Sequence, residues 1–260
     1  LIYNIQNVKI DVNPYKHLKE SHPLTKSNKT MLKTFGGITG PEIVIDSGRA
    51  HGIKSPEFLK TVDRFIDRIS KKKEINNVVS AVGIIKQMNA SLNNTDELTI
   101  PNSPEAVAQL ILMYNISVES EKSLSNFISP DFRKLRLSLF GENNSSVEGV
   151  EMAREFVIIA RKMGLRAHVT GTVFSKQKMV TMVIPTFLKS IGLSFSIILF
   201  VMILYMRSVG MSLLAMIPNI TPLAFASGVL GLTEHPVDIT VAVVSSVCLG
   251  IAVDLSLIHI

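Results

Sequence analysis

The sequence predicts an α+β domain over residues 1–178, followed by three membrane-spanning helices over residues 179–260. Charge is dense as far as Lys189 and then nearly disappears. Only four residues after position 189 are formally charged: Arg207, Glu234, Asp238 and Asp254. A surface that faces water cannot be so poor in charge. In the first part, by contrast, short apolar runs follow the periods of strands and helices.

Composition excludes several other classes of protein. The formal net charge is +6, but the lysines are scattered among acids and form no basic stripe interleaved with aromatic residues. We therefore expect no nucleic-acid partner. Cys248 is the single cysteine, so the chain cannot form an internal disulfide. The chain starts without Met and without a signal peptide, and we expect it to be the interior of a longer protein.

Two β-α-β units are predicted in the first part. The expected strands are residues 42–46, 77–82, 133–140 and 166–170. Ser55 precedes Pro56, a helix-start signal, and apolar residues at helical spacing continue to about Lys72. The further expected helices are residues 83–92, 104–117 and 146–163, the last of which ends at Gly164. Two successive β-α-β units predict a ferredoxin-like split β-α-β layer.

No catalytic constellation is apparent in this domain. The histidines at positions 17, 22, 51 and 168 are dispersed, without the spacing of a metal site. There is no nucleophile elbow and no glycine-rich phosphate loop. The sequence therefore predicts that the chain is not an enzyme and uses no cofactor or metal.

The three spans are predicted at about residues 183–206, 211–232 and 237–257, each near the 20 residues that cross the hydrocarbon. Arg207 lies in the first connecting loop, and Glu234 and Asp238 lie in the second. The positive-inside rule places Arg207 in the cytoplasm. The large domain is then expected on the periplasmic or extracellular side of a plasma (inner) membrane, in a multi-pass protein.

Four residues of the spans are candidate functional residues: Pro218, Asn219, Pro222 and Asp254. The two prolines interrupt the second span, either as a packing kink or as a flexible point that moves during transport. An acid inside a membrane helix costs about 2.5–3.5 kcal/mol and marks ion or proton pathways. The alternative is that Asp254 ends the third span near the cytoplasmic interface.

Several motifs resemble a known family. They are residues 217–222 (IPNITP), 228–231 (GVLG), 236–240 (PVDIT) and 249–254 (LGIAVD) in the spans, and 35–37, 98–101, 128–132 and 169–172 upstream. Together they resemble half of a resistance–nodulation–division exporter, in the branch related to mycobacterial large membrane proteins. The resemblance implies a porter domain between the first and second helices, then the second to fourth helices.

The same resemblance implies a function and its residues. Asp254 corresponds to the acid of the family's proton relay. We expect Pro218-Asn219 to form the bend in the neighbouring helix. The implied partners are the lipid bilayer, protons, a lipid or hydrophobic cargo, and the remaining half of the transporter. Two rivals share the architecture: an accessory subunit of protein export, and a sterol-sensing-like protein that binds lipid without pumping.

The last six residues, 255–260, depart from the family pattern, which continues after the acid with a small polar residue, Ile and His. They match the translation of a sequencing adapter (CTG TCT CTT ATA CAC ATC). We expect that the natural part of this sequence ends at Asp254 and that the last six residues are read-through into adapter, so His259 is given no role. Finding these codons at the locus in source DNA would refute the expectation.

Overall fold

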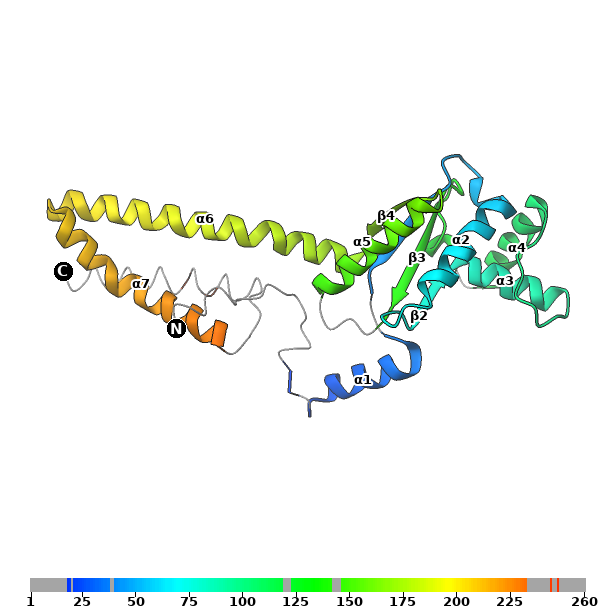
Figure 1. Ribbon diagram of the computed structural model, residues 1–260, viewed down its shortest axis with the longest axis horizontal. Helices are drawn as coiled ribbons and strands as arrows, with labels where there is room; N and C mark the ends of the chain where they lie inside the picture. Colours follow the sequence, from blue (N-terminus) through cyan, green and yellow to red (C-terminus); the bar gives the residue numbers. More distant parts are fainter. Residues whose placement is uncertain are drawn as a thin grey trace. The chain divides into compact units, whose positions relative to one another are not determined.

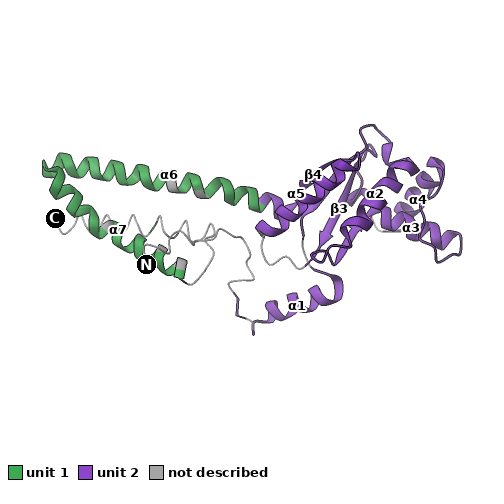
Figure 2. Cartoon of the chain, in the orientation of Figure 1, with its two compact units in different colours: residues 1–12, 176–260 green, residues 13–175 purple. Residues whose placement is uncertain are grey.

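The computed structural model describes residues 18–19, 21–37, 40–118, 123–141 and 146–232, together with residues 244 and 247. Two compact units divide the chain: residues 13–175, and residues 176–260 with residues 1–12 (Figure 2). The first unit holds a mixed α/β domain, and the second holds long helices (Figure 1). The predicted mixed α/β class of the first part is confirmed.

The domain contains a four-stranded antiparallel sheet in the order β2-β3-β1-β4. Its strands are β1 (Glu42–Asp46), β2 (Asn77–Ser80), β3 (Lys134–Phe140) and β4 (Arg166–Thr170). In the register of the central pair, Ile43 lies opposite Leu137. Because β3 lies between β1 and β2, and β1 lies between β3 and β4, the two β-α-β units interleave as a split β-α-β layer requires.

The helices of the domain pack on one face of this sheet. They are α2 (Pro56–Ile69), α3 (Ala81–Leu92), α4 (Pro104–Ser117) and α5 (Ser146–Lys162), with short 3-10 turns η3 (Gly52–Lys54) and η5 (Leu124–Asn126). Helices α3 and α5 pack against the strands, and α4 packs against α3. Alternate strand residues such as Ile45 and Leu137 are fully buried beneath them, with Phe65 of α2 and Phe156 of α5 in the same core. The period of two along each strand thus separates a dry face from a polar one.

Helix starts follow the expected signals, with two differences. Ser103 caps α4, where its hydroxyl accepts a hydrogen bond from the Ala106 N–H at 3.2 Å. Ser55 occupies the cap position of α2 but accepts no such bond, so Pro56 carries that start. Ser80 was expected inside a strand, whereas it ends β2 and caps α3 by accepting from the Gly83 N–H.

Helix α1 (Pro23–Phe35) was not predicted. Its start carries a usable signal, because His22 accepts a hydrogen bond from the Leu24 N–H and Pro23 occupies the first helical position. Gly36 ends it with a φ of 83°, a left-handed conformation that favours glycine. The motif at residues 35–37 therefore lies at the end of a helix.

The second unit contains α7 (Val209–Leu232) and all of α6 (Thr172–Met206) except its first four residues. Helix α6 begins eleven residues before the predicted span at 183, and Pro185 lies inside it without ending it. The helix thus extends beyond the apolar stretch that the sequence marks. The third predicted span, residues 237–257, lies outside the described residues except for Val244 and Val247, which are helical.

Candidate transport segment

Within the described residues, α6 is long and apolar enough to cross a membrane, and α7 is a second candidate if its two bent parts form one span. Leu193, Phe200 and Leu204 of α6 are each more than 60% exposed. Water would penalise such a surface by about 25 cal/mol for each Å² of apolar area, whereas lipid would not. The outward-facing leucines therefore distinguish α6 from the core helix of a soluble protein.

The length of α6 exceeds that of a minimal span. Its 35 residues measure about 52 Å at 1.5 Å per residue, against about 30 Å of hydrocarbon. Lys189 and Arg207 bracket an uncharged stretch, residues 190–206. Their long side chains can reach the polar interfaces while their stems stay in apolar surroundings. The first part of α6 is thus available to link the sheet to the bilayer.

A single residue joins the sheet to this helix. Strand β4 ends at Thr170 and α6 begins at Thr172, with Gly171 between them at a φ of 95°. A Cβ at Gly171 would lie 2.8 Å from Cγ of Glu42, the first residue of β1. Both the backbone conformation and the close approach require glycine. The connection between the edge strand β4 and α6 is therefore one residue long and tolerates only glycine.

Helix α7 is bent by 41° between Val209–Pro218 and Ile220–Ala226. Pro218 and Pro222 have no N–H to donate to the carbonyls four residues earlier, and their rings crowd the preceding turn. The Thr221 hydroxyl donates to the Ile217 carbonyl at 2.8 Å, a bond that often accompanies a bent helix. Asn219 lies at the break, and its side chain lies outside the described residues.

The candidate residues are therefore only partly brought together. Pro218, Asn219 and Pro222 lie within about one turn of α7, and both prolines are exposed. Asp254 lies outside the described residues. The role of all four residues in transport remains a prediction.

Sequence reasoning missed a charged pair at the end of the sheet opposite α6. The Arg133 guanidinium donates from Nε and Nη2 to the two carboxylate oxygens of Asp46, at 2.8 and 2.9 Å. This hydrogen bond to Arg133 is the main cause that lowers the pKa of Asp46, and it raises the pKa of Arg133. The two residues are 87 positions apart, so no local pattern could indicate the pair.

The same end of the domain holds two strained residues in contact. His51 and Phe132 have φ values of 59° and 53°, in a region that non-glycine residues rarely adopt. Their rings stack at 5.7 Å, and the Lys54 ammonium lies 4.5 Å from the Phe132 ring centre. The His51 and Ile53 N–H groups donate to the carbonyls of Asp131 and Phe132. These bonds hold the segment 128–132, one of the motifs noted in the sequence.

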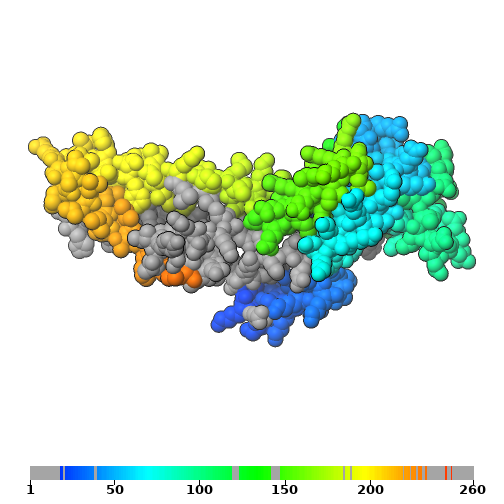
Figure 3. Space-filling view, in the orientation of Figure 1, coloured from blue at the N-terminus to red at the C-terminus, as the bar shows by residue number. Residues whose placement is uncertain are grey.

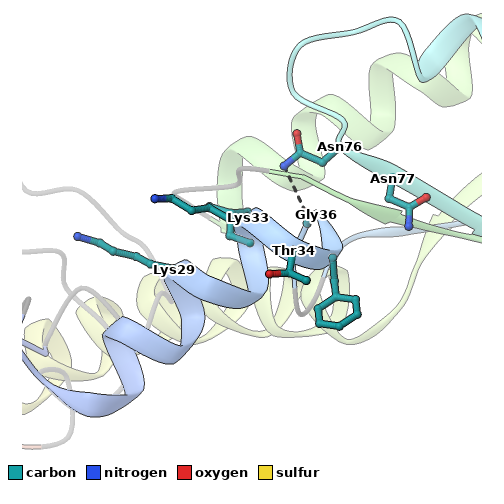
Figure 4. A pocket seen from close by; sticks show the side chains of 8 residues that line it. Lys29, Lys33, Thr34, Gly36, Asn76 and Asn77 are labelled. Carbon is teal, nitrogen blue, oxygen red and sulfur yellow. Dashed lines mark hydrogen bonds between the residues drawn. The ribbon is translucent and has the colours of Figure 1, made fainter.

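A hollow of about 710 Å³ lies at the other end of the domain (Figure 4). It is lined by residues of α1 and of the start of β2: Lys29, Leu32, Lys33, Thr34, Phe35, Gly36, Asn76 and Asn77. The Asn76 amide donates to the Gly36 carbonyl at 3.3 Å. In Figure 4 the Lys29 and Lys33 side chains extend toward the same side. The polar lining thus consists of ammonium, amide, hydroxyl and backbone groups, without a carboxylate.

These features define a class of protein: a membrane protein in which an antiparallel α/β domain continues directly into apolar helices. The family comparison identifies it further. The sequence profile of the MMPL family matches residues 16–257. The chain belongs to the MMPL family, and the resemblance drawn from the motifs is confirmed at this level. The match includes the domain, both described long helices and the position of Asp254.

A curated relative supports the membrane assignment. A candidate membrane protein of Methanocaldococcus jannaschii is 24% identical over 260 aligned residues. The alignment covers 95% of this chain and 64% of the relative. The chain therefore spans less than two thirds of the length of the relative that it matches.

Proposed function

We propose that this chain is part of a proton-driven exporter of lipids or other hydrophobic and amphiphilic compounds. The observation that carries the proposal is the continuous family match over residues 16–257, from the α/β domain to beyond Asp254. Members of one family can still differ in cargo, so the class of cargo rests on the apolar, lipid-compatible surface of α6 and on the resemblance of the motifs.

In this proposal the parts have separate roles. Asp254 gains and loses a proton inside the membrane, where acids mark proton pathways. The bend at Pro218-Asn219 changes the shape of α7 in response. Gly171 transmits the movement of α6 to β4 through its one-residue junction. The domain of residues 13–175 acts as the porter domain on the periplasmic or extracellular side of the plasma membrane.

The test uses the full-length protein, which supplies the remaining helices of the transporter. We would reconstitute it in vesicles with an imposed pH gradient and follow a fluorescent phospholipid and internal pH together. Lipid movement should depend on the gradient. Asp254→Asn should abolish both lipid and proton flux, whereas Asp254→Glu, which keeps a titratable carboxyl, should retain part of each.

The other outcomes identify the rivals. Lipid binding without gradient-dependent movement, unchanged in Asp254→Asn, would overturn the pump and favour a sterol-sensing-like protein that binds lipid. Gradient-dependent movement of a secreted polypeptide, without lipid movement, would favour an accessory subunit of protein export. Equal lipid flux with and without the gradient would remove the proton from the mechanism.

A further inference from the structure

One end of the sheet is joined directly to the membrane helix. Glu42 of β1 pairs with Thr170 of β4, and Asn77 of β2 pairs with Phe140 of β3. These residues mark one end of the four strands, and α6 begins two residues after Thr170. Helix α1 is attached at the same end, since Asn76 beside β2 holds the Gly36 carbonyl. We call this the stem end of the domain.

The stem end gathers lysines that are dispersed in the sequence. Six exposed lysines of the domain lie there, three on α1 and three in the turn that follows α2: Lys26, Lys29, Lys33, Lys71, Lys72 and Lys73. The described acids of this end are Glu42, which is paired with Arg136 at 3.5 Å, Asp67 and Glu74 on either side of the lysine turn, and Glu148 and Glu151 near the start of α5. Among the described residues of the stem end, the cations outnumber these acids.

Helix α1 is amphipathic as well as basic. At 100° per residue, Leu24, Met31 and Phe35 fall within about 40° of one another, and the three lysines cluster on the opposite side. The three apolar side chains are 57%, 36% and 60% exposed. No residue of α1 is buried, and no acid lies between Pro23 and Phe35. In Figure 3, α1 (blue) forms a ridge at the edge of the domain.

We infer that the stem end binds the anionic phospholipid headgroups of the bilayer, with α1 as the helix that inserts its apolar edge. A basic polar face with an exposed apolar edge is the pattern of helices that bind membrane interfaces. Each lysine near an anionic surface favours binding by about 1 kcal/mol, or about fivefold. The hollow beside α1 is also lined by Lys33, Asn76 and Asn77, and no carboxylate is among its lining residues.

The experiment places a fluorescent label on each side of α1 in the full chain. In a Cys248→Ala background, an environment-sensitive dye is attached to Met31→Cys on the apolar edge, or to Thr30→Cys on the polar side. Each protein is incorporated into nanodiscs of phosphatidylcholine alone or with about 30% phosphatidylglycerol, and quenching by spin-labelled lipid is measured. We expect at least twofold stronger quenching at position 31 than at 30, only with phosphatidylglycerol.

Matched charge variants test the lysines. Replacing Lys26, Lys29 and Lys33 together with Gln should remove the dependence of quenching on phosphatidylglycerol. The ratio of inserted to free α1 in phosphatidylglycerol nanodiscs should fall by about a hundredfold. The control removes three exposed cations from the opposite end of the domain: Arg49, Lys134 and Lys162. This control should leave quenching unchanged. Circular dichroism and gel filtration would verify that both variants fold.

Three outcomes would overturn the inference. Equal quenching at positions 30 and 31 would show that the apolar edge does not insert. Equal quenching in the two lipid compositions would show that the lysines do not select anionic headgroups. A blue-shifted dye at position 31 that lipid quenchers cannot reach would show that a protein surface covers α1. None of these readings depends on proton flux, so they are independent of the proposed transport cycle.

Discussion

The domain buries in its core the same apolar residue types that the long helices expose on their surface. In the domain core, Phe65 of α2 and Leu135 and Leu137 of β3 are 0% exposed. In α6, Phe200 and Leu204 are 61% and 62% exposed. The difference teaches that side-chain burial follows the solvent: water drives apolar groups inward, whereas a bilayer accepts them on the outer surface.

The largest expected effect is on the stability of the domain, and it should distinguish a phenylalanine of the domain core from one of α6. Phe65→Ala removes a fully buried ring from the domain core and should lower the free energy of unfolding by about 3–5 kcal/mol. Phe200→Ala should leave domain stability unchanged, because this ring contributes nothing to that core. Denaturant unfolding of the full chain in detergent, followed by far-ultraviolet circular dichroism, measures both. Equal losses would mean that α6 packs as a soluble core helix.

A second contrast uses two apolar residues of nearly equal exposure, Leu112 of α4 at 60% and Phe200 of α6 at 61%. Leu112→Lys should be nearly neutral, because this side chain faces water. Phe200→Lys should cost about 2.5–3.5 kcal/mol of membrane insertion, the range for a charge near the centre of a span. A glycosylation-site insertion assay reports the fraction of α6 that spans. Full insertion of the lysine variant would contradict a lipid-facing position.

The smallest effect concerns pH, and it should be confined to the domain. No Asp or Glu occurs from Thr172 to Leu232, whereas the pKa of Asp46 is lowered mainly by its hydrogen bond to Arg133. A lowered pKa in the folded state stabilises the domain above the ordinary value of 3.8, and this contribution is lost as pH falls through the folded pKa.

Asp46→Asn should therefore lower the melting temperature of the domain at pH 7 and have little effect near pH 2. The pair is partly exposed, so a small shift is expected. Thermal unfolding of both proteins across this pH range measures it. Glu105→Gln, at the exposed start of α4, provides a control for loss of a surface acid. A constant difference between Asp46→Asn and the parent protein at all pH values would show that charge is not the cause.

The prediction of strands and helices succeeded where patterns are local. The strands at 42–46 and 166–170 and the helix at 104–117 are confirmed within a residue, because alternation and capping residues act over short distances. It failed at Ser80, which reads as the continuation of a strand but caps α3. It also omitted α1, whose apolar residues are too few and too exposed to indicate a buried face.

Other features depended on residues distant in the sequence. The lysines of α1 and those after α2 are about 40 positions apart in the chain, so the sequence suggests only a solvated surface. The sheet brings them to the stem end. Asp46 and Arg133 meet because β1 and β3 are neighbours in register. Antiparallel pairing, not local sequence, sets these distances.

By itself, the sequence determined that the chain enters a membrane and at which residues the α/β domain is followed by apolar helices. It also contained the motifs that relate the chain to the MMPL family. These properties follow from composition and local periodicity, which need no tertiary information. The tertiary structure decided the strand order β2-β3-β1-β4, the bend of α7, the Asp46–Arg133 pair and the basic stem end. Each depends on contacts or angles that form only when the chain folds, because long-range packing selects them.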